Sequence, residues 1–131
     1  MASDNEQFVR QWADALNRGD FELMARDVGP DFEWVVAREH PDAATHRGPE
    51  AVSAYLAEWR RMMPDFRVEI VELEERGDRV LTVIEITGTG AGSGARTEVR
   101  TATISTFSDG KPVRTEEYLD PEEARAELAA G

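Results

Sequence analysis

The 131-residue chain contains no cysteine, so disulfide bonds and thiolate catalysis are excluded. A zinc site would have to use histidine and carboxylate ligands alone, and the sequence has only two histidines. Basic residues are also few, since Lys and Arg total 15 against 27 Asp and Glu, a formal net charge of −12. That charge repels nucleic acid and anionic membrane surfaces, so we expect neither as a partner.

Long apolar runs are missing as well, and none approaches the length that crosses a bilayer. The first six residues have neither the basic nor the apolar segment of a signal peptide, so a cytoplasmic location is expected. Hydrophobic residues still make up 40% of the chain, enough for a buried core. The length fits one domain, expected to span residues 1–131.

Three helices are expected in the first half of the chain. Ser3 begins a capping box before an apolar stripe with four-residue spacing, and Gly19 is placed to end that helix. Asp20 caps a second, shorter helix, which stops at Gly29-Pro30. Pro49 suits the first turn of the third helix.

Strands are expected to dominate the remainder. Apolar and polar residues alternate over 32–37, a polar loop follows to Arg47, and further strands are expected at 66–73, 79–87, 96–107 and 112–119. Asp109-Gly110 is typical of a tight hairpin turn, and Asp120 is placed to cap a short C-terminal helix. Helices and one curled antiparallel sheet that share a core predict an α+β fold, with a cavity at the open end of the sheet.

Three local patterns carry a resemblance to a known superfamily. W-A-D-A-L-N-R-G-D at 12–20 is similar to the first helix and turn of nuclear transport factor 2-like proteins. R-G-P-E-A-V at 47–52 resembles the start of their third helix, and F-S-D-G-K-P-V at 107–113 with E-Y-L-D at 117–120 resembles their final hairpin. The order of elements agrees, so nearly the whole chain resembles a SnoaL-like, ketosteroid isomerase-related domain.

The resemblance implies a cone-shaped curved antiparallel sheet wrapped around three helices, a cystatin-like arrangement. It implies a pocket for a small hydrophobic molecule, no cofactor, and a homodimer that pairs through the outer face of the sheet. The superfamily includes steroid isomerases, polyketide cyclases, dehydratases, epoxide hydrolases and binding modules, so the fold does not determine the function.

The catalytic residues of two of these enzyme classes are not matched. The resemblance places Trp12 where ketosteroid isomerases have a tyrosine, Val36 at the position of their base, and Thr103 near their second acid. Valine cannot take a proton, and tryptophan offers a single N–H. The epoxide hydrolase set is also broken, because Ile84 and Ile86 occupy its central positions.

Glu117 is the strongest candidate for a catalytic residue. SnoaL-like cyclases use an acid near the end of the fold, which Glu117 or Asp120 could supply. Val113, Thr115, Glu117 and Leu119 share one face of the last strand, and that face begins and ends apolar, which favours a core-facing carboxylate. Burial disfavours the charged form of a carboxylate, which suits a general acid or base. The alternative is a carboxylate at the open rim, paired with arginine or water.

His40 and His46 are the other catalytic candidates. They lie in the loop before the third helix, where a histidine at the pocket mouth could donate a proton. With Asp42 they form H-x-D-x-x-x-H, which matches no strong metal motif, so no metal is expected.

The pocket is expected to be lined from the apolar helix stripes and the inward strand faces, by Trp12, Leu16, Trp34, Val36, Tyr55, Trp59, Ile84, Thr103 and Ser105. Two functions remain open. One is a cofactor-free acid–base isomerase, cyclase or lyase, and the other is a non-catalytic module for ligand binding or dimerisation. Converging polar groups in the cavity would favour the enzyme, and an apolar cavity with one anchoring group would favour binding.

Overall fold

The computed structural model describes residues 3–40 and 43–131, and the chain begins with two helices, α1 (Asp4–Arg18) and α2 (Phe21–Arg26). Ser3 Oγ accepts a backbone N–H of the first turn of α1 at 3.1 Å. Gly19 ends α1 with a φ of 73°, a left-handed conformation that favours glycine. The Asp20 carboxylate caps α2. All three predicted caps are confirmed.

Two short strands and a third helix follow. They are β1 (Glu33–Val35), β2 (Thr45–Arg47) and α3 (Gly48–Met62). The expected loop before α3 thus contains β2, which pairs antiparallel with β1. Its residues Thr-His-Arg include no apolar side chain, so no alternation could reveal the strand. Unlike the expected all-antiparallel sheet, β1 pairs in parallel with β6.

Four long strands complete a six-stranded sheet in the order β2-β1-β6-β5-β4-β3. Their bounds are β3 (Arg67–Arg76), β4 (Arg79–Thr89), β5 (Arg96–Ser108) and β6 (Lys111–Tyr118). Asp109 and Gly110 connect β5 to β6 with φ values of 54° and 78°, which is the backbone of a type I′ hairpin turn. This predicted turn is confirmed.

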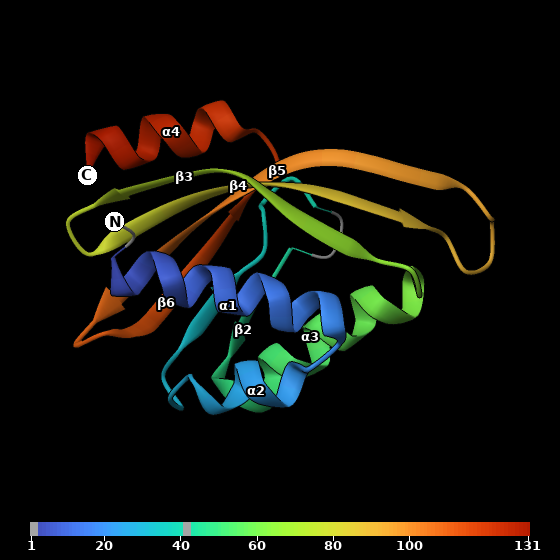
Figure 1. The fold of residues 1–131 in the computed structure, drawn as a ribbon, viewed down its shortest axis with the longest axis horizontal. Coiled ribbons are helices and arrows are strands. Elements are labelled where there is room, and N and C mark those ends of the chain that lie inside the picture. Colours follow the sequence, from blue (N-terminus) through green and yellow to red (C-terminus); the bar gives the residue numbers. More distant parts are fainter. Residues whose placement is uncertain (1–2, 41–42) are drawn as a thin grey trace.

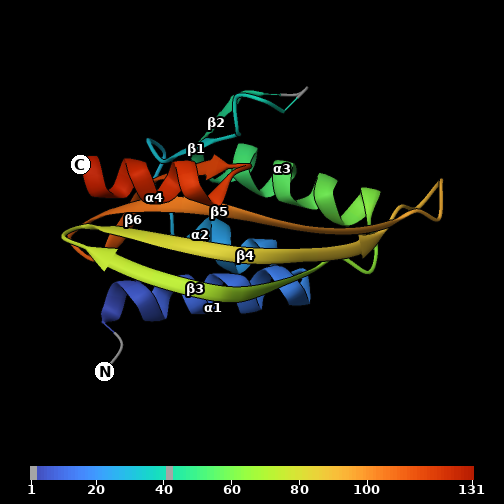
Figure 2. The same cartoon turned by 90° about the horizontal axis from the view of Figure 1, so that it is seen from above.

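The sheet separates the helices into two layers (Figures 1 and 2). α1, α2 and α3 lie on one face, and α4 (Pro121–Ala130) lies on the other. α1 packs against β3 and β4, whereas α4 packs against β4, β5 and β6. The predicted α+β fold, a curved sheet around three helices, is confirmed, with α4 as an addition outside it. No helix in the described part of the chain is long and apolar enough to span a membrane.

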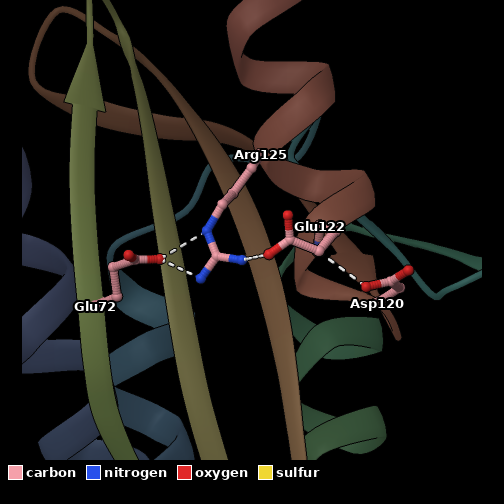
Figure 3. Close-up of polar contacts among 4 residues, drawn as sticks. All are labelled: Glu72, Asp120, Glu122 and Arg125. Carbon is pink, nitrogen blue, oxygen red and sulfur yellow. Dashed lines mark hydrogen bonds and ion pairs between the residues drawn. The ribbon is translucent and has the colours of Figure 1, made fainter.

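Helix α4 covers apolar side chains on the outer face of the sheet. The buried cluster beneath it consists of Leu81, Val83, Ala102, Ile104, Ala124 and Leu128. Asp120 caps α4 by accepting the Glu122 N–H at 2.9 Å. Arg125 places Nε and Nη2 at 3.0 and 2.6 Å from Glu72 Oε2 on β3 and also pairs with Glu122 (Figure 3). The homodimer expected through this outer face stays a prediction.

Candidate functional site

A cavity of about 130 Å³ lies between the inner face of the sheet and the helices α1, α2 and α3. Its wall is mainly aliphatic and aromatic, with a few hydroxyls, one carboxylate and one imidazole. The lining residues are Val9, Trp12, Ala13, Leu16, Met24, Trp34, His40, Leu56, Trp59, Phe66, Val68, Thr82, Ile84, Ile86, Thr101, Thr103, Ser105, Thr115, Glu117, Tyr118 and Leu119. Such a wall suits a small apolar molecule that carries a few polar groups.

A β-bulge in β6 decides which of its residues face this cavity. Thr106 pairs with Arg114 and Phe107 pairs with Pro112, which leaves Val113 as an extra residue. Pro112 is buried and Val113 is 42% exposed, whereas Thr115 and Glu117 lie in the cavity wall. The strict alternation expected from Val113 to Leu119 therefore fails at Val113, because a bulge shifts side-chain direction by one residue.

Two aromatic donors hold the carboxylate of Glu117. Trp34 Nε1 from β1 and the Tyr55 hydroxyl from α3 each lie 2.6 Å from Glu117 Oε2. Within the described residues no donor contacts Oε1. The carboxylate is thus oriented through one oxygen, Oε2, by donors from β1 and α3.

Tyr55 is held in its protonated form. Burial, followed by the charge of Glu117 and the hydrogen bond to it, raises the pKa of the Tyr55 phenol well above its usual range, and a hydrogen bond with Trp59 acts in the opposite direction. The His46 ring stacks on Tyr55 with ring centroids 4.5 Å apart. The phenol is therefore a stable hydrogen-bond donor to Glu117.

Trp12 turns its polar edge away from the cavity. Its Nε1 donates to Asp27 Oδ2 at 3.3 Å, and its ring stacks on Trp34 with centroids 6.2 Å apart. Asp27 ends α2, and sequence reasoning missed it as a partner. The indole N–H is consequently unavailable as a donor to a ligand, although the Trp12 ring forms part of the wall.

Most of the residues predicted for the pocket lie in the cavity wall. They are Trp12, Leu16, Trp34, Trp59, Ile84, Thr103 and Ser105, together with the catalytic candidates Glu117 and His40. Whether any of them binds a ligand stays a prediction.

The structure places three other predicted residues outside the wall. Val36 lies beyond the end of β1, is 3% exposed, and borders a second hollow instead of this cavity. Tyr55 contacts Glu117 Oε2 without lying in the wall itself, and His46 stacks on the Tyr55 ring. The alternation expected over 32–37 ends with β1 at Val35, and of Trp34 and Val36 only Trp34 lies in the cavity wall.

The cavity hydroxyls differ in their partners. Ser105 Oγ and Thr115 Oγ1 lie 2.9 Å apart and satisfy each other. Thr82 is 2% exposed, and its Oγ1 is buried without a partner in the described part of the chain. Sequence reasoning missed Thr82, although it alternates with Val80 and Ile84 on one face of β4, a signal that could have found it.

A second hollow lies on the other side of β6, bordered by α4 and the segment after β1. Its wall carries the carboxylates of Glu39, Glu116, Glu117, Glu123 and Glu127, so Glu117 and Tyr118 border both hollows. Within residues 3–40 and 43–131, no three His, Cys, Asp or Glu side chains are grouped to hold a metal ion. Asp42, considered above with the two histidines, lies outside the described residues.

The comparisons with known proteins agree with this architecture. The model of the SnoaL-like domain matches residues 9–115. A nuclear transport factor 2-like protein from Burkholderia xenovorans LB400 is 30% identical, with 94% of this chain and 95% of that chain covered and a TM-score of 0.73. No curated protein matches the chain.

Two further solved structures share the fold at lower identity. A candidate SnoaL-like polyketide cyclase from Jannaschia sp. CCS1 is 19% identical over 98% of this chain and 93% of that chain, with a TM-score of 0.79. TerC, co-crystallised with polyporic acid, is 24% identical over 98% of this chain and 100% of that chain, with a TM-score of 0.78. The family model covers most of the chain, and the sheet and helices have the matching arrangement. The chain therefore belongs to the SnoaL-like domain family and has the nuclear transport factor 2-like fold.

Proposed function

We propose that this protein binds a small, largely apolar and uncharged molecule in the cavity, and that Glu117 Oε1 accepts a hydrogen bond from it. The observation that carries the proposal is the carboxylate in the cavity wall, held through Oε2 by Trp34 and Tyr55 at 2.6 Å each. A fixed acceptor in a mainly apolar wall selects ligands that bring a donor, since an acceptor oxygen covered by an apolar ligand loses its hydrogen bond to water.

Charge supports the choice of an uncharged ligand. A carboxylate in the wall and a net charge of −12 both disfavour anions. The candidate polyketide cyclase and the protein co-crystallised with polyporic acid, both of this fold, support a small organic molecule as the class of ligand.

The test is calorimetric titration of the purified chain with para-cresol and with toluene. Both fit a cavity of this size, and only para-cresol carries a donor. The Glu117→Gln variant should weaken para-cresol binding by about tenfold, as expected for a lost hydrogen bond to a charged group. Toluene binding should stay unchanged.

Glu116→Gln is the matched control, because Glu116 neighbours Glu117 and borders the second hollow instead of this cavity. It should leave both affinities unchanged. Equal loss of both ligands in Glu117→Gln, or no binding by the wild type, would contradict the proposal.

A second candidate function is cofactor-free acid–base catalysis, of the isomerase, cyclase or lyase type. The observation that favours it is the presence of His40 and Glu117 in the same cavity wall, since proton transfer needs groups that can carry protons. Glu117 would remove a proton from carbon next to a carbonyl group. Loss of deuterium from a labelled cyclic ketone, followed by NMR, measures this step. Glu117→Gln should abolish the exchange, and exchange at the rate of the buffer alone would leave binding as the only function.

A further inference from the structure

Three polar side chains form a row across the inner face of the sheet. Thr82 on β4 pairs with Thr103 on β5, and Thr103 pairs with Glu117 on β6. Residues directly opposite one another in a sheet point to the same face, and all three lie in the cavity wall. Glu117 and Thr82 are the two ends of this row.

The hydroxyl of Thr82 is chemically unusual within this wall. Ser105 and Thr115 bond to each other, whereas Thr82 Oγ1 is buried and has no partner among the described residues. A buried hydroxyl without a partner is unfavourable, and such groups in native structures call for an explanation. Rotation about χ1 by about 120° moves Oγ1 to the position of the methyl group, so the hydroxyl can turn toward a molecule in the cavity.

The dimensions of the row limit what can lie between its ends. Neighbouring strands are about 4.8 Å apart, so the backbones of Glu117 and Thr82 are separated by about 10 Å. Thr103 lies between the two ends on the same face, so a ring that joins them would lie over Thr103. A cavity of about 130 Å³ is close to the roughly 150 Å³ of an engineered cavity that binds benzene.

We propose that Thr82 is a second anchor for the ligand, opposite Glu117, and that the site takes a single-ring molecule with a hydroxyl at one end and an oxygen acceptor at the other. Glu117 accepts the ligand hydroxyl through Oε1, the oxygen that no donor among the described residues contacts. Thr82 donates its O–H to the far oxygen and so gains the partner that it lacks. A para-hydroxyaryl ketone is the simplest molecule of this class. This inference rests on the proposed function, because it places the ligand in the same cavity.

The test compares two probes of nearly equal size, para-hydroxyacetophenone and para-ethylphenol, by calorimetric titration of the full chain. Both carry the hydroxyl for Glu117, and only the first carries a ketone oxygen. Thr82→Val replaces the hydroxyl by a methyl group at almost constant volume. It should weaken para-hydroxyacetophenone by about fivefold and change para-ethylphenol by less than about twofold.

Two further variants keep the result interpretable. Thr101→Val removes another cavity hydroxyl, from the row that contains Ile84, and should not alter the ratio of the two affinities. Thr82→Ser keeps a hydroxyl and should retain the preference for the ketone, which a purely steric effect at Thr82 would not do. The melting temperature of Thr82→Val without ligand should equal or exceed that of the wild type, since an unpartnered hydroxyl is removed.

The possible outcomes separate the two proposals. If para-ethylphenol binds the wild type and Thr82→Val affects both probes equally or neither, the second anchor is overturned and the proposed binding function stands. If neither probe binds the wild type, both proposals fail together.

Discussion

The hydroxyl of Tyr55 should stabilise the fold through Glu117, and Tyr55→Phe removes it without changing the ring. The distance of 2.6 Å from the Tyr55 oxygen to Glu117 Oε2 lies in the range of about 2.5–2.7 Å for a hydroxyl bonded to a charged oxygen. Such bonds contribute about 1.5–3 kcal/mol. We expect a loss of about 1.5 kcal/mol, the lower end, because Trp34 still donates to the same oxygen. For a chain of this length the melting temperature should fall by about 5 °C.

The assay is urea denaturation of four proteins, the wild type, Tyr55→Phe, Glu117→Gln and the double variant. If the two groups interact directly, the losses in free energy of unfolding caused by the two single substitutions will not add up to the loss in the double variant. The difference, which is the coupling energy, should be about 1 kcal/mol. Tyr118→Phe is the control, because the Tyr118 hydroxyl makes no hydrogen bond to the described residues. A loss in Tyr55→Phe no larger than that in Tyr118→Phe, or fully additive losses, would refute the reasoning.

Two other features of the structure lead to measurable expectations. Burial raises the pKa of Tyr55 and of Tyr118, the two tyrosines of the chain, so their stabilising contributions are complete below about pH 10 and are lost as the pH rises from there toward the folded pKa values. In the Tyr118→Phe variant, which leaves Tyr55 alone, tyrosinate absorbance should therefore rise only together with the loss of near-ultraviolet circular dichroism, and an earlier rise would contradict the burial of the Tyr55 phenol. At α4, Leu128→Ala should lower the free energy of unfolding by about 3 kcal/mol, since Leu128 is 1% exposed. Arg125→Ala, which breaks a solvent-exposed contact with Glu72, should lower it much less in the same denaturant titration.

The helices could be predicted from the sequence because their signals are local. Ser3, Gly19 and Asp20 act through backbone groups within a few residues, and each behaves as expected. β2 and the parallel pairing of β1 with β6 could not be predicted in this way. Both depend on contacts between segments far apart in the chain, and periodicity within one segment carries no information on its neighbour.

The candidate site was predictable only where a residue follows a clear pattern. Glu117 and Trp34 stand out as a carboxylate and an aromatic ring on largely apolar strand faces, and both lie in the wall. The roles of Tyr55 and Asp27 were not accessible, because each is defined by a hydrogen bond to a residue at least 15 positions away. Thr82 was overlooked because one threonine in a run of valine, leucine and isoleucine is the usual composition of a buried strand.

The bulge at Val113 connects the sequence of β6 to the chemistry of the cavity. Pro112 is buried on the side of the strand before the bulge, and continued alternation from it would turn Arg114 and Glu116 inward. The extra residue reverses this, so that Thr115 and Glu117 face the cavity and Arg114 and Glu116 face outward, where Arg114 pairs with Glu33 and Glu116. The sequence prediction placed Glu117 inward while starting from Val113 as a core residue, a premise that the structure contradicts. One inserted residue thus decides which glutamate of the Glu116-Glu117 pair meets Trp34 and Tyr55.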